Sequence, residues 1–140
     1  MTSHQSEWLI EYEESLDETR IVNVSYDREG DILEIFFAEG AGSGIELTDE
    51  IVLRYNQATG TPLSLILLSF SHLVQPTEYG PESFRLSGLE KLSPERRETI
   101  MRILTSPPVN HYLRVSALTL PRSHRLVPIT TVRPLLAVVT

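Results

Sequence analysis

The sequence predicts an α+β fold, in which an antiparallel β-meander over about residues 21–71 is covered by one amphipathic helix over about residues 94–105 and followed by further strands. Three observations predict it. Two pairs of strand-forming segments are separated by turn-forming residues. One later segment carries a helical apolar stripe between a capping serine and two prolines. Strand-forming residues then return after residue 113. A single amphipathic helix after a meander most simply covers one face of the sheet.

The first hairpin has the clearest pattern. Residues 21–26 and 32–37 are rich in β-branched and aromatic residues, which favour strands. The turn between them is Asp-Arg-Glu-Gly-Asp over residues 27–31. Gly30 can take positive φ without a Cβ clash, and the aspartate side chains can accept hydrogen bonds from the local backbone. We therefore expect two antiparallel neighbours here.

A second hairpin follows an acidic run at Glu46, Asp49 and Glu50. Its strands are predicted at residues 51–55 and 63–70, with a turn at 56–60. The second of these strands has almost no polar face, so we place it at the centre of the sheet. The Gly-rich residues 38–44 are expected to form a link between the hairpins, because they lack the pattern of a phosphate-binding loop.

Two motifs in this region carry a resemblance to a known family. The first is Tyr-Asp-x-Glu-x-Asp-x-Leu-x-Ile at residues 26–35, and the second is Glu-x-x-Asp-x-Ile-x-x-x-Tyr at residues 46–55. Together with Gly60 before the apolar strand, they resemble the bacterial domain-of-unknown-function family 2283 over about residues 22–71. The resemblance implies a β-meander and no defined activity. Its association with small toxin-like proteins implies an antitoxin-like role as one hypothesis.

The sequence departs from the family pattern at two positions. Arg54 begins an Arg-Tyr-Asn segment where many members have Asp-Tyr-Asp, and Glu34 stands where an aromatic residue is common. Both positions are expected to be exposed. The departures therefore count against a shared binding site more than against the fold.

The C-terminal half is expected to be an extension made of a helix and strands. Ser93 is placed to cap the helix, and Pro94 suits its first position. Strands are predicted at residues 113–120 and 126–132, and Pro128 assigns the second of them to a sheet edge. The apolar segment 135–139 is expected to pair as a strand, within this chain or with a partner. A short helical turn is also predicted near residues 87–92.

Length and composition favour one domain over residues 1–140, with the family-like core at 22–71 and the extension at 76–140. The first twenty residues fit a strand by alternation and a helix by apolar spacing, and we expect an ordered extension held by Trp8, with a flexible acidic arm as the alternative. There is no cysteine, no signal-peptide pattern and no apolar run of membrane-spanning length, so a cytoplasmic location without a membrane partner is expected.

Charge is unevenly distributed along the chain. The net charge is −7, which counts against nucleic-acid binding. Residues 1–70 hold fourteen acidic and three basic side chains, whereas residues 71–140 hold five acidic and nine basic ones. Either the two halves pack together, within a chain or across a dimer, or the acidic half faces a basic partner protein.

No constellation of residues predicts a catalytic, cofactor or metal site. The carboxylates of residues 27, 29 and 31 fit turn chemistry and not a calcium loop, and the histidines lack metal-ligand spacing. The polar segment Asn110-His111-Tyr112, with Arg114 nearby, is the most site-like. The four histidines are His4, His72, His111 and His124. Four arginines could contact nucleic-acid phosphates, but their spacing also fits ordinary outward-facing positions: Arg114, Arg122, Arg125 and Arg133.

The leading functional hypothesis is a small non-catalytic protein that acts through protein–protein contacts, as a homodimer. One alternative is an antitoxin-like partner of a small basic toxin. Another is a hydrolase or nuclease-like enzyme that uses His111 or the carboxylates of Asp49 and Glu50, which requires these side chains to converge in one pocket.

Overall fold

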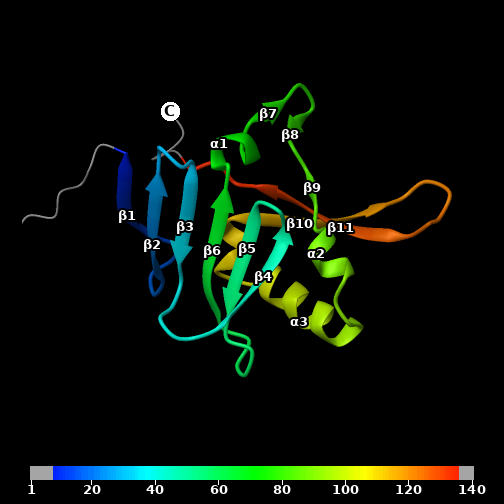
Figure 1. Ribbon diagram of the computed structural model, residues 1–140, viewed down its shortest axis with the longest axis horizontal. Coiled ribbons are helices and arrows are strands. Elements are labelled where there is room, and N and C mark those ends of the chain that lie inside the picture. The colour runs from blue at the N-terminus through cyan, green and yellow to red at the C-terminus, as the bar shows by residue number, and fades with distance from the viewer. Residues whose placement is uncertain (1–7, 136–140) are drawn as a thin grey trace, which may run out of the picture.

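The computed structural model describes residues 8–135, and its largest element is a six-stranded sheet in the order β1-β2-β3-β6-β5-β4 (Figure 1). All neighbouring strands in it are antiparallel. The sheet therefore consists of two three-stranded meanders, β1-β2-β3 and β4-β5-β6, joined along β3 and β6. The strands are β1 (Leu9–Ser15), β2 (Ile21–Asp27), β3 (Ile32–Phe36), β4 (Ser43–Thr48), β5 (Ile51–Tyr55) and β6 (Pro62–Leu68).

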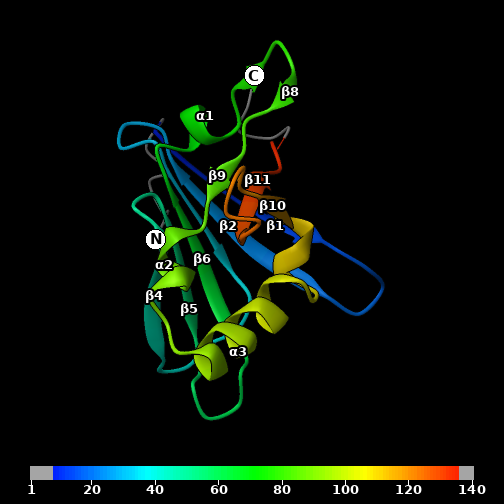
Figure 2. The same ribbon diagram turned by 90° about the vertical axis from the view of Figure 1, so that its right-hand side faces the viewer.

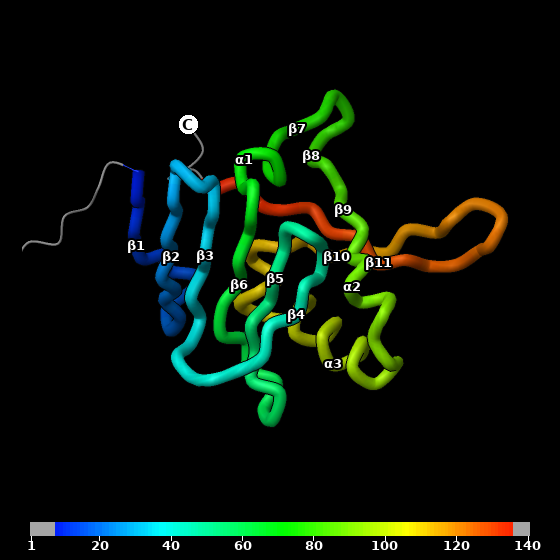
Figure 3. The backbone as a smooth tube through the Cα atoms, in the orientation of Figure 1, coloured from blue at the N-terminus to red at the C-terminus, as the bar shows by residue number. Residues whose placement is uncertain are grey.

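The predicted antiparallel sheet is confirmed, with the most apolar strand, β6, next to its centre. The sheet is larger than predicted, because β1 and β4 add one strand at each edge, and Ser43 and Gly44 belong to β4 rather than to the link. The link itself crosses one end of the sheet and carries the chain from β3 to the far edge, so that β6 rather than β4 pairs with β3 (Figure 3). Phe37 N donates to Leu63 O at 2.8 Å as the crossing begins.

Strand β1 settles the ambiguity of the N-terminal segment. It pairs with β2 from Leu9↔Asp27 to Ser15↔Ile21, so the alternating pattern was the correct one. Trp8, however, is 51% exposed and does not anchor the strand. The strand is held instead by its backbone pairing and by Ile10, Tyr12 and Leu16, which pack against the core.

Helices and a second sheet cover one face of the large sheet (Figure 2). They comprise α1 (Phe70–Leu73), α2 (Ser87–Glu90), α3 (Pro94–Leu104), the 3₁₀ helix η1 (Val109–His111), and β9 (Phe84–Arg85), β10 (Leu113–Thr119) and β11 (Leu126–Val132). A small β7 (Pro76–Thr77) and β8 (Gly80–Pro81) ribbon lies beyond α1. Fully buried Leu33, Ile35, Leu65 and Leu67 of the sheet meet Leu104 in the core between the layers. No helix within residues 8–135 is long and apolar enough to cross a membrane.

Helix α3 matches its sequence prediction closely. Ser93 is the N-cap, with its Oγ accepting from Arg96 N at 3.3 Å, and Pro94 takes the first position. Ile100, Ile103 and Leu104 are buried and form the stripe that faces the sheet. The helical turn expected near residues 87–92 is α2.

The predicted C-terminal strands form a long hairpin, paired from Leu113↔Val132 to Thr119↔Leu126. One prediction here was wrong: β11 is the middle strand of its sheet, not an edge strand, because β9 pairs with it at Ile129 and Thr130. The carbonyl of Pro128 accepts from Leu86 N at 2.9 Å and so points to the β9 side. Its nitrogen faces the same way, so the pairing with β10 loses no hydrogen bond through the missing N–H. Of the apolar segment 135–139, only Leu135 lies among the described residues, and it is buried.

Candidate functional site

The carboxylates of the first hairpin serve local structure. Asp27 Oδ1 accepts from Glu29 N at 3.0 Å and Gly30 N at 3.1 Å, as expected for a turn. Asp31 reaches further: it accepts from Tyr26 Oη at 2.6 Å, Ser71 N at 3.0 Å and Ser71 Oγ at 2.5 Å. Partial burial acts to raise the pKa of Asp31, but the hydrogen bonds from Ser71 and Tyr26 outweigh it and lower the pKa below its ordinary value. Asp31 thus ties the first hairpin to the start of α1.

The residues proposed for an enzyme do not converge. Asp49 and Glu50 lie at the turn between β4 and β5, at one edge of the large sheet. His111 contacts Glu14 of β1, which forms the opposite edge. Within residues 8–135 no three His, Asp or Glu side chains are grouped to hold a metal ion. His4 lies outside the described residues, and His72 packs edge-on against the ring of Phe84.

The segment Asn110-His111-Tyr112 does take part in a polar cluster. Glu14 Oε1 accepts from Tyr112 Oη at 2.9 Å and lies 3.2 Å from His111 Nε2. The guanidinium of Arg133 lies against the ring of His111, with Nη1 3.0 Å from Nδ1. Nη1 also lies against Nε2 of the same ring, and because arginine can only donate, a ring nitrogen is the acceptor in this contact. The chain of contacts therefore runs Tyr112–Glu14–His111–Arg133.

Burial gives this cluster its electrostatic character. Tyr112 is 1% exposed. Desolvation raises its pKa, and the hydrogen bond to Glu14 raises it further, so that the phenol remains a donor at neutral pH. Desolvation also raises the pKa of nearby Tyr12 to about 12, with a smaller contribution from the charge of Glu14. The cluster fixes strand β1 to the end of η1 and to β11.

The sequence could not identify two members of this cluster. Glu14 is separated from Tyr112 by 98 residues. It also lies in a segment whose sequence fits both a strand and a helix. Arg133 resembles any other exposed arginine of the C-terminal half. Beside the cluster lies a cavity of about 350 Å³ between η1 and the base of the β10–β11 hairpin. Arg114, which was singled out with His111, lines it.

A second candidate is the face of the large sheet that turns away from the helices. No helix or strand within residues 8–135 covers it (Figures 1 and 2). Ile32 is 37% exposed and Phe36 is 38% exposed, whereas Val52, Ile66 and Leu68 are half-buried among their neighbours. We call this surface, with residues Ile32, Glu34, Phe36, Val52, Arg54, Ile66 and Leu68 at its centre, the open face. Contiguous exposed apolar surface of this kind is typical of contact sites.

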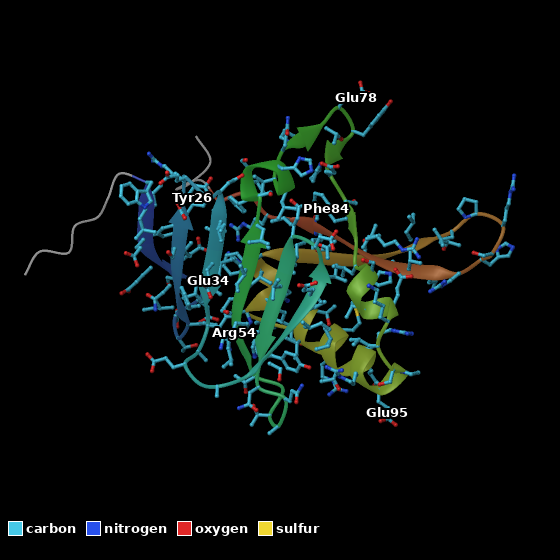
Figure 4. The ribbon with its side chains drawn as sticks, viewed as in Figure 1. Tyr26, Glu34, Arg54, Glu78, Phe84 and Glu95 are labelled. Atoms are coloured by element: carbon cyan, nitrogen blue, oxygen red, sulfur yellow. The ribbon has the colours of Figure 1, made fainter. Side chains whose placement is uncertain are left out.

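The charges of the open face are arranged in a simple order. Glu34 and Arg54 both project from it (Figure 4). Glu34 lies beside Ile66, and Arg54 lies beside Ser64, so the two are separated by strand β6 and form no ion pair with each other. Glu11 and Glu13 of β1 and Glu46 of β4 lie towards the two edges. The centre is therefore apolar, with one acid and one base, and the edges are acidic.

The open face is uneven. One hollow is lined by Asn23, Phe36 and Arg54 among others, and a second by Glu13, Asn23 and Phe36. Phe36 borders both. Ser64, next to Phe36 on the same face, is fully buried, and its Oγ has no hydrogen-bond partner among the described residues.

The chain was compared with other proteins in three ways. Protein-family models, curated proteins and solved structures yield no match. The resemblance to family 2283 consequently stays a prediction from its motifs. Two surfaces of the described residues are the candidates for function: the cluster at His111 with its cavity, and the open face.

Proposed function

We propose that this protein acts through protein–protein contacts and that it forms a homodimer in which two open faces pack together. The single observation that carries the proposal is the apolar face of the six-stranded sheet, which no helix or strand of residues 8–135 covers. Sheets whose strands have apolar residues on both faces are normally covered on both. Six strands spaced about 4.8 Å apart, with about 3.4 Å per residue along each, give a face roughly 24 Å by 20 Å, which is the scale of a β-sandwich interface.

The charges favour a particular arrangement of the two copies. With a two-fold axis along the strands, between β3 and β6, β3 of one copy lies over β6 of the other. Glu34 then lies over the partner's Ile66. The partner's Arg54 is one strand across and two residues along from that Ile66, so the lateral distance between Glu34 and the partner's Arg54 is about 8 Å. Both side chains are long enough to meet across the gap of about 10 Å between packed sheets. Each of the two pairs would give Glu34 and Arg54 a charge partner that neither has among residues 8–135 of its own chain.

An axis across the strands is less favourable. It would place each strand over its own copy, so that Glu34 and the partner's Arg54 stay two strands apart and Glu34 is buried without a cation. An unpaired carboxylate at an apolar interface is costly. In the preferred arrangement the remaining acids, Glu11, Glu13 and Glu46, lie at the solvated rim, where their repulsion is screened by salt.

Charge reversal tests this arrangement. We expect the wild type to sediment as a dimer at micromolar concentration. The single variants Glu34→Arg and Arg54→Glu should each raise the dimer Kd about tenfold or more, because each leaves like charges facing across the axis. The double variant, with both substitutions, should restore the dimer. Glu95→Arg, on the exposed surface of α3, is the matched control and should leave the Kd unchanged.

The outcomes separate the alternatives. A wild type that stays monomeric at the highest soluble concentration would refute the homodimer. Failure of the double variant to recover, when both single variants weaken association, would refute the axis along the strands. Phe36→Ala should also weaken the dimer, since the ring projects from the centre of the interface.

The acidic edges of the open face favour a second candidate, a basic partner protein, which is the antitoxin-like hypothesis. This partner would be attracted by Glu11, Glu13 and Glu46 and repelled by Arg54. Arg54→Glu should therefore strengthen binding of a basic protein while it weakens the homodimer. Co-purification of wild type and Arg54→Glu from native cells, compared by mass spectrometry, distinguishes the two occupants.

A further inference from the structure

The cavity beside His111 is lined by basic and amide side chains. Its walls come from η1, from the base of the β10–β11 hairpin and from Pro81 of β8, and its volume is about 350 Å³. The polar side chains that line it are Asn110, His111, Arg114, Thr131 and Arg133. None of the lining residues is acidic. The cavity therefore presents donors of hydrogen bonds and positive charge, in a chain whose net charge is −7.

The two arginines of the cavity have no acidic partner within residues 8–135. No carboxylate there lies within ion-pair distance of Arg114 or Arg133, whereas Arg85 and Arg125 both bind Glu90. Guanidinium groups offer paired N–H donors in a geometry that fits the oxygens of phosphate and carboxylate. Two of them at one cavity, with the Asn110 amide, are the donor set of an oxyanion site.

Other contacts hold Arg133 in place. Its backbone N donates to Tyr112 O at 2.9 Å, and its guanidinium lies against the ring of His111. The ring is oriented by Glu14, which also accepts from Tyr112 Oη. The carboxylate of Glu14 thus already accepts from Tyr112 and lies against Nε2, a ring nitrogen that Arg133 Nη1 also contacts. Such an arrangement lowers the ordering cost when a ligand binds, because the donor is already positioned.

We propose that this cavity binds a phosphate group through Arg114 and Arg133, with Asn110 as a further donor. Phosphate is favoured over a carboxylate because its charge and its oxygens match two separate guanidinium groups rather than one. The phosphate can be free or part of a monoester, and the two sources share this chemistry. The site is independent of the open face, which lies on the other side of the sheet.

The test is a titration with inorganic phosphate at constant ionic strength, followed by the ¹H–¹⁵N resonances of the arginine Nε–H groups and backbone amides. We expect saturable shifts confined to residues 110–114 and 131–134. Arg114→Gln and Arg133→Gln should each weaken binding about tenfold, the effect of losing one charge-assisted contact. Arg122→Gln, at the hairpin tip, makes the same charge change outside the cavity and should have no effect.

The controls decide between outcomes. All three arginines are exposed, and the circular dichroism spectrum of each variant confirms that the fold is kept. Non-saturating shifts spread over the basic surface, or an equal loss for Arg122→Gln, would overturn the site. A parallel titration with adenosine 5′-monophosphate identifies the source: tighter binding than inorganic phosphate indicates a monoester ligand, and equal affinity indicates free phosphate. Loss of dimerisation by Glu34→Arg should leave phosphate binding unchanged.

Discussion

Replacement of Asp31 by asparagine should destabilise the protein by about 2 kcal/mol. The carboxylate accepts three hydrogen bonds, and a net bond to a charged group is worth roughly 1.5–3 kcal/mol. Asparagine keeps Oδ1, which accepts from Tyr26 Oη and Ser71 N, but it places an NH₂ group where Oδ2 accepts from Ser71 Oγ and, at 3.2 Å, from Ser71 N. Ser71 Oγ can rotate to accept, whereas Ser71 N cannot. The expected loss is therefore about one bond plus the charge assistance of the others.

Asp31→Asn removes the charge of the side chain without straining the backbone at residue 31. Asp31 has a φ of 54°, in the left-handed region, and asparagine adopts this conformation at least as readily as aspartate. Asp27→Asn is the matched control in the same turn. Both hydrogen bonds of Asp27 go to one oxygen, Oδ1, which asparagine retains, so the change should cost less than about 0.5 kcal/mol.

Urea unfolding at fixed protein concentration measures the difference. A loss of about 2 kcal/mol corresponds to a fall of the midpoint by about 1 M at an unchanged slope. Because the pKa of Asp31 is lowered from 3.8 in the folded protein, its contribution is fully present above that value and is lost as the pH falls through the lowered pKa. Equal losses in the two variants, or an advantage of wild type over Asp31→Asn that survives in strong acid, would refute the reasoning.

Two further predictions concern the packing of the second layer. Gly88→Ala should destabilise the fold by about 3 kcal/mol or more in urea unfolding, because a Cβ there would lie 1.8 Å from Glu46 O and force α2 away from β4. Gly44→Ala is the control. A Cβ at Gly44 would have its nearest neighbour at 3.8 Å, so this change should alter stability by less than about 0.5 kcal/mol. Glu90→Gln should speed hydrogen exchange of the β10–β11 amides at pH 7, because Glu90 binds both Arg85 and Arg125. The bidentate bond from Arg85 lowers the pKa of Glu90, so this contribution is present above 4.5 and is lost as the pH falls through the lowered value.

Sequence reasoning found the elements that depend on local chemistry. The strands of both hairpins follow from alternation and turn residues, and α3 follows from the Ser93 cap, Pro94 and its apolar stripe. The order of the strands does not follow from local chemistry. It depends on the crossing of residues 37–42, where Gly42 passes so close to the sheet that a Cβ would lie 2.4 Å from Tyr55 O. That contact joins residues distant in sequence, and a Gly-rich segment looks the same whether it crosses a sheet or hangs free.

The site was only partly predictable for the same reason. The polar character of Asn110-His111-Tyr112 was visible in the sequence, but the side chain that orients His111 comes from β1. The β1 segment fitted a helix as well as a strand, so no sequence argument could place Glu14 there. Glu34 and Arg54 were predicted to be exposed; both lie on the open face but are half-buried (Figure 4). That they carry opposite charge at the centre of one face emerges only from the pairing of β3 and β5 with β6.

Strand β1 connects the two surfaces through the alternation of its side chains. Glu11 and Glu13 project towards the open face, whereas Tyr12 and Glu14 project towards the layer that contains His111. Neighbouring acids on one strand thus belong to different surfaces, one at the rim of the proposed interface and one behind the proposed phosphate site. A shift of β1 by one residue would exchange them and remove Glu14 from Tyr112. The complete pairing of β1 with β2 is therefore what keeps the two surfaces separate, and it allows each to be altered without the other.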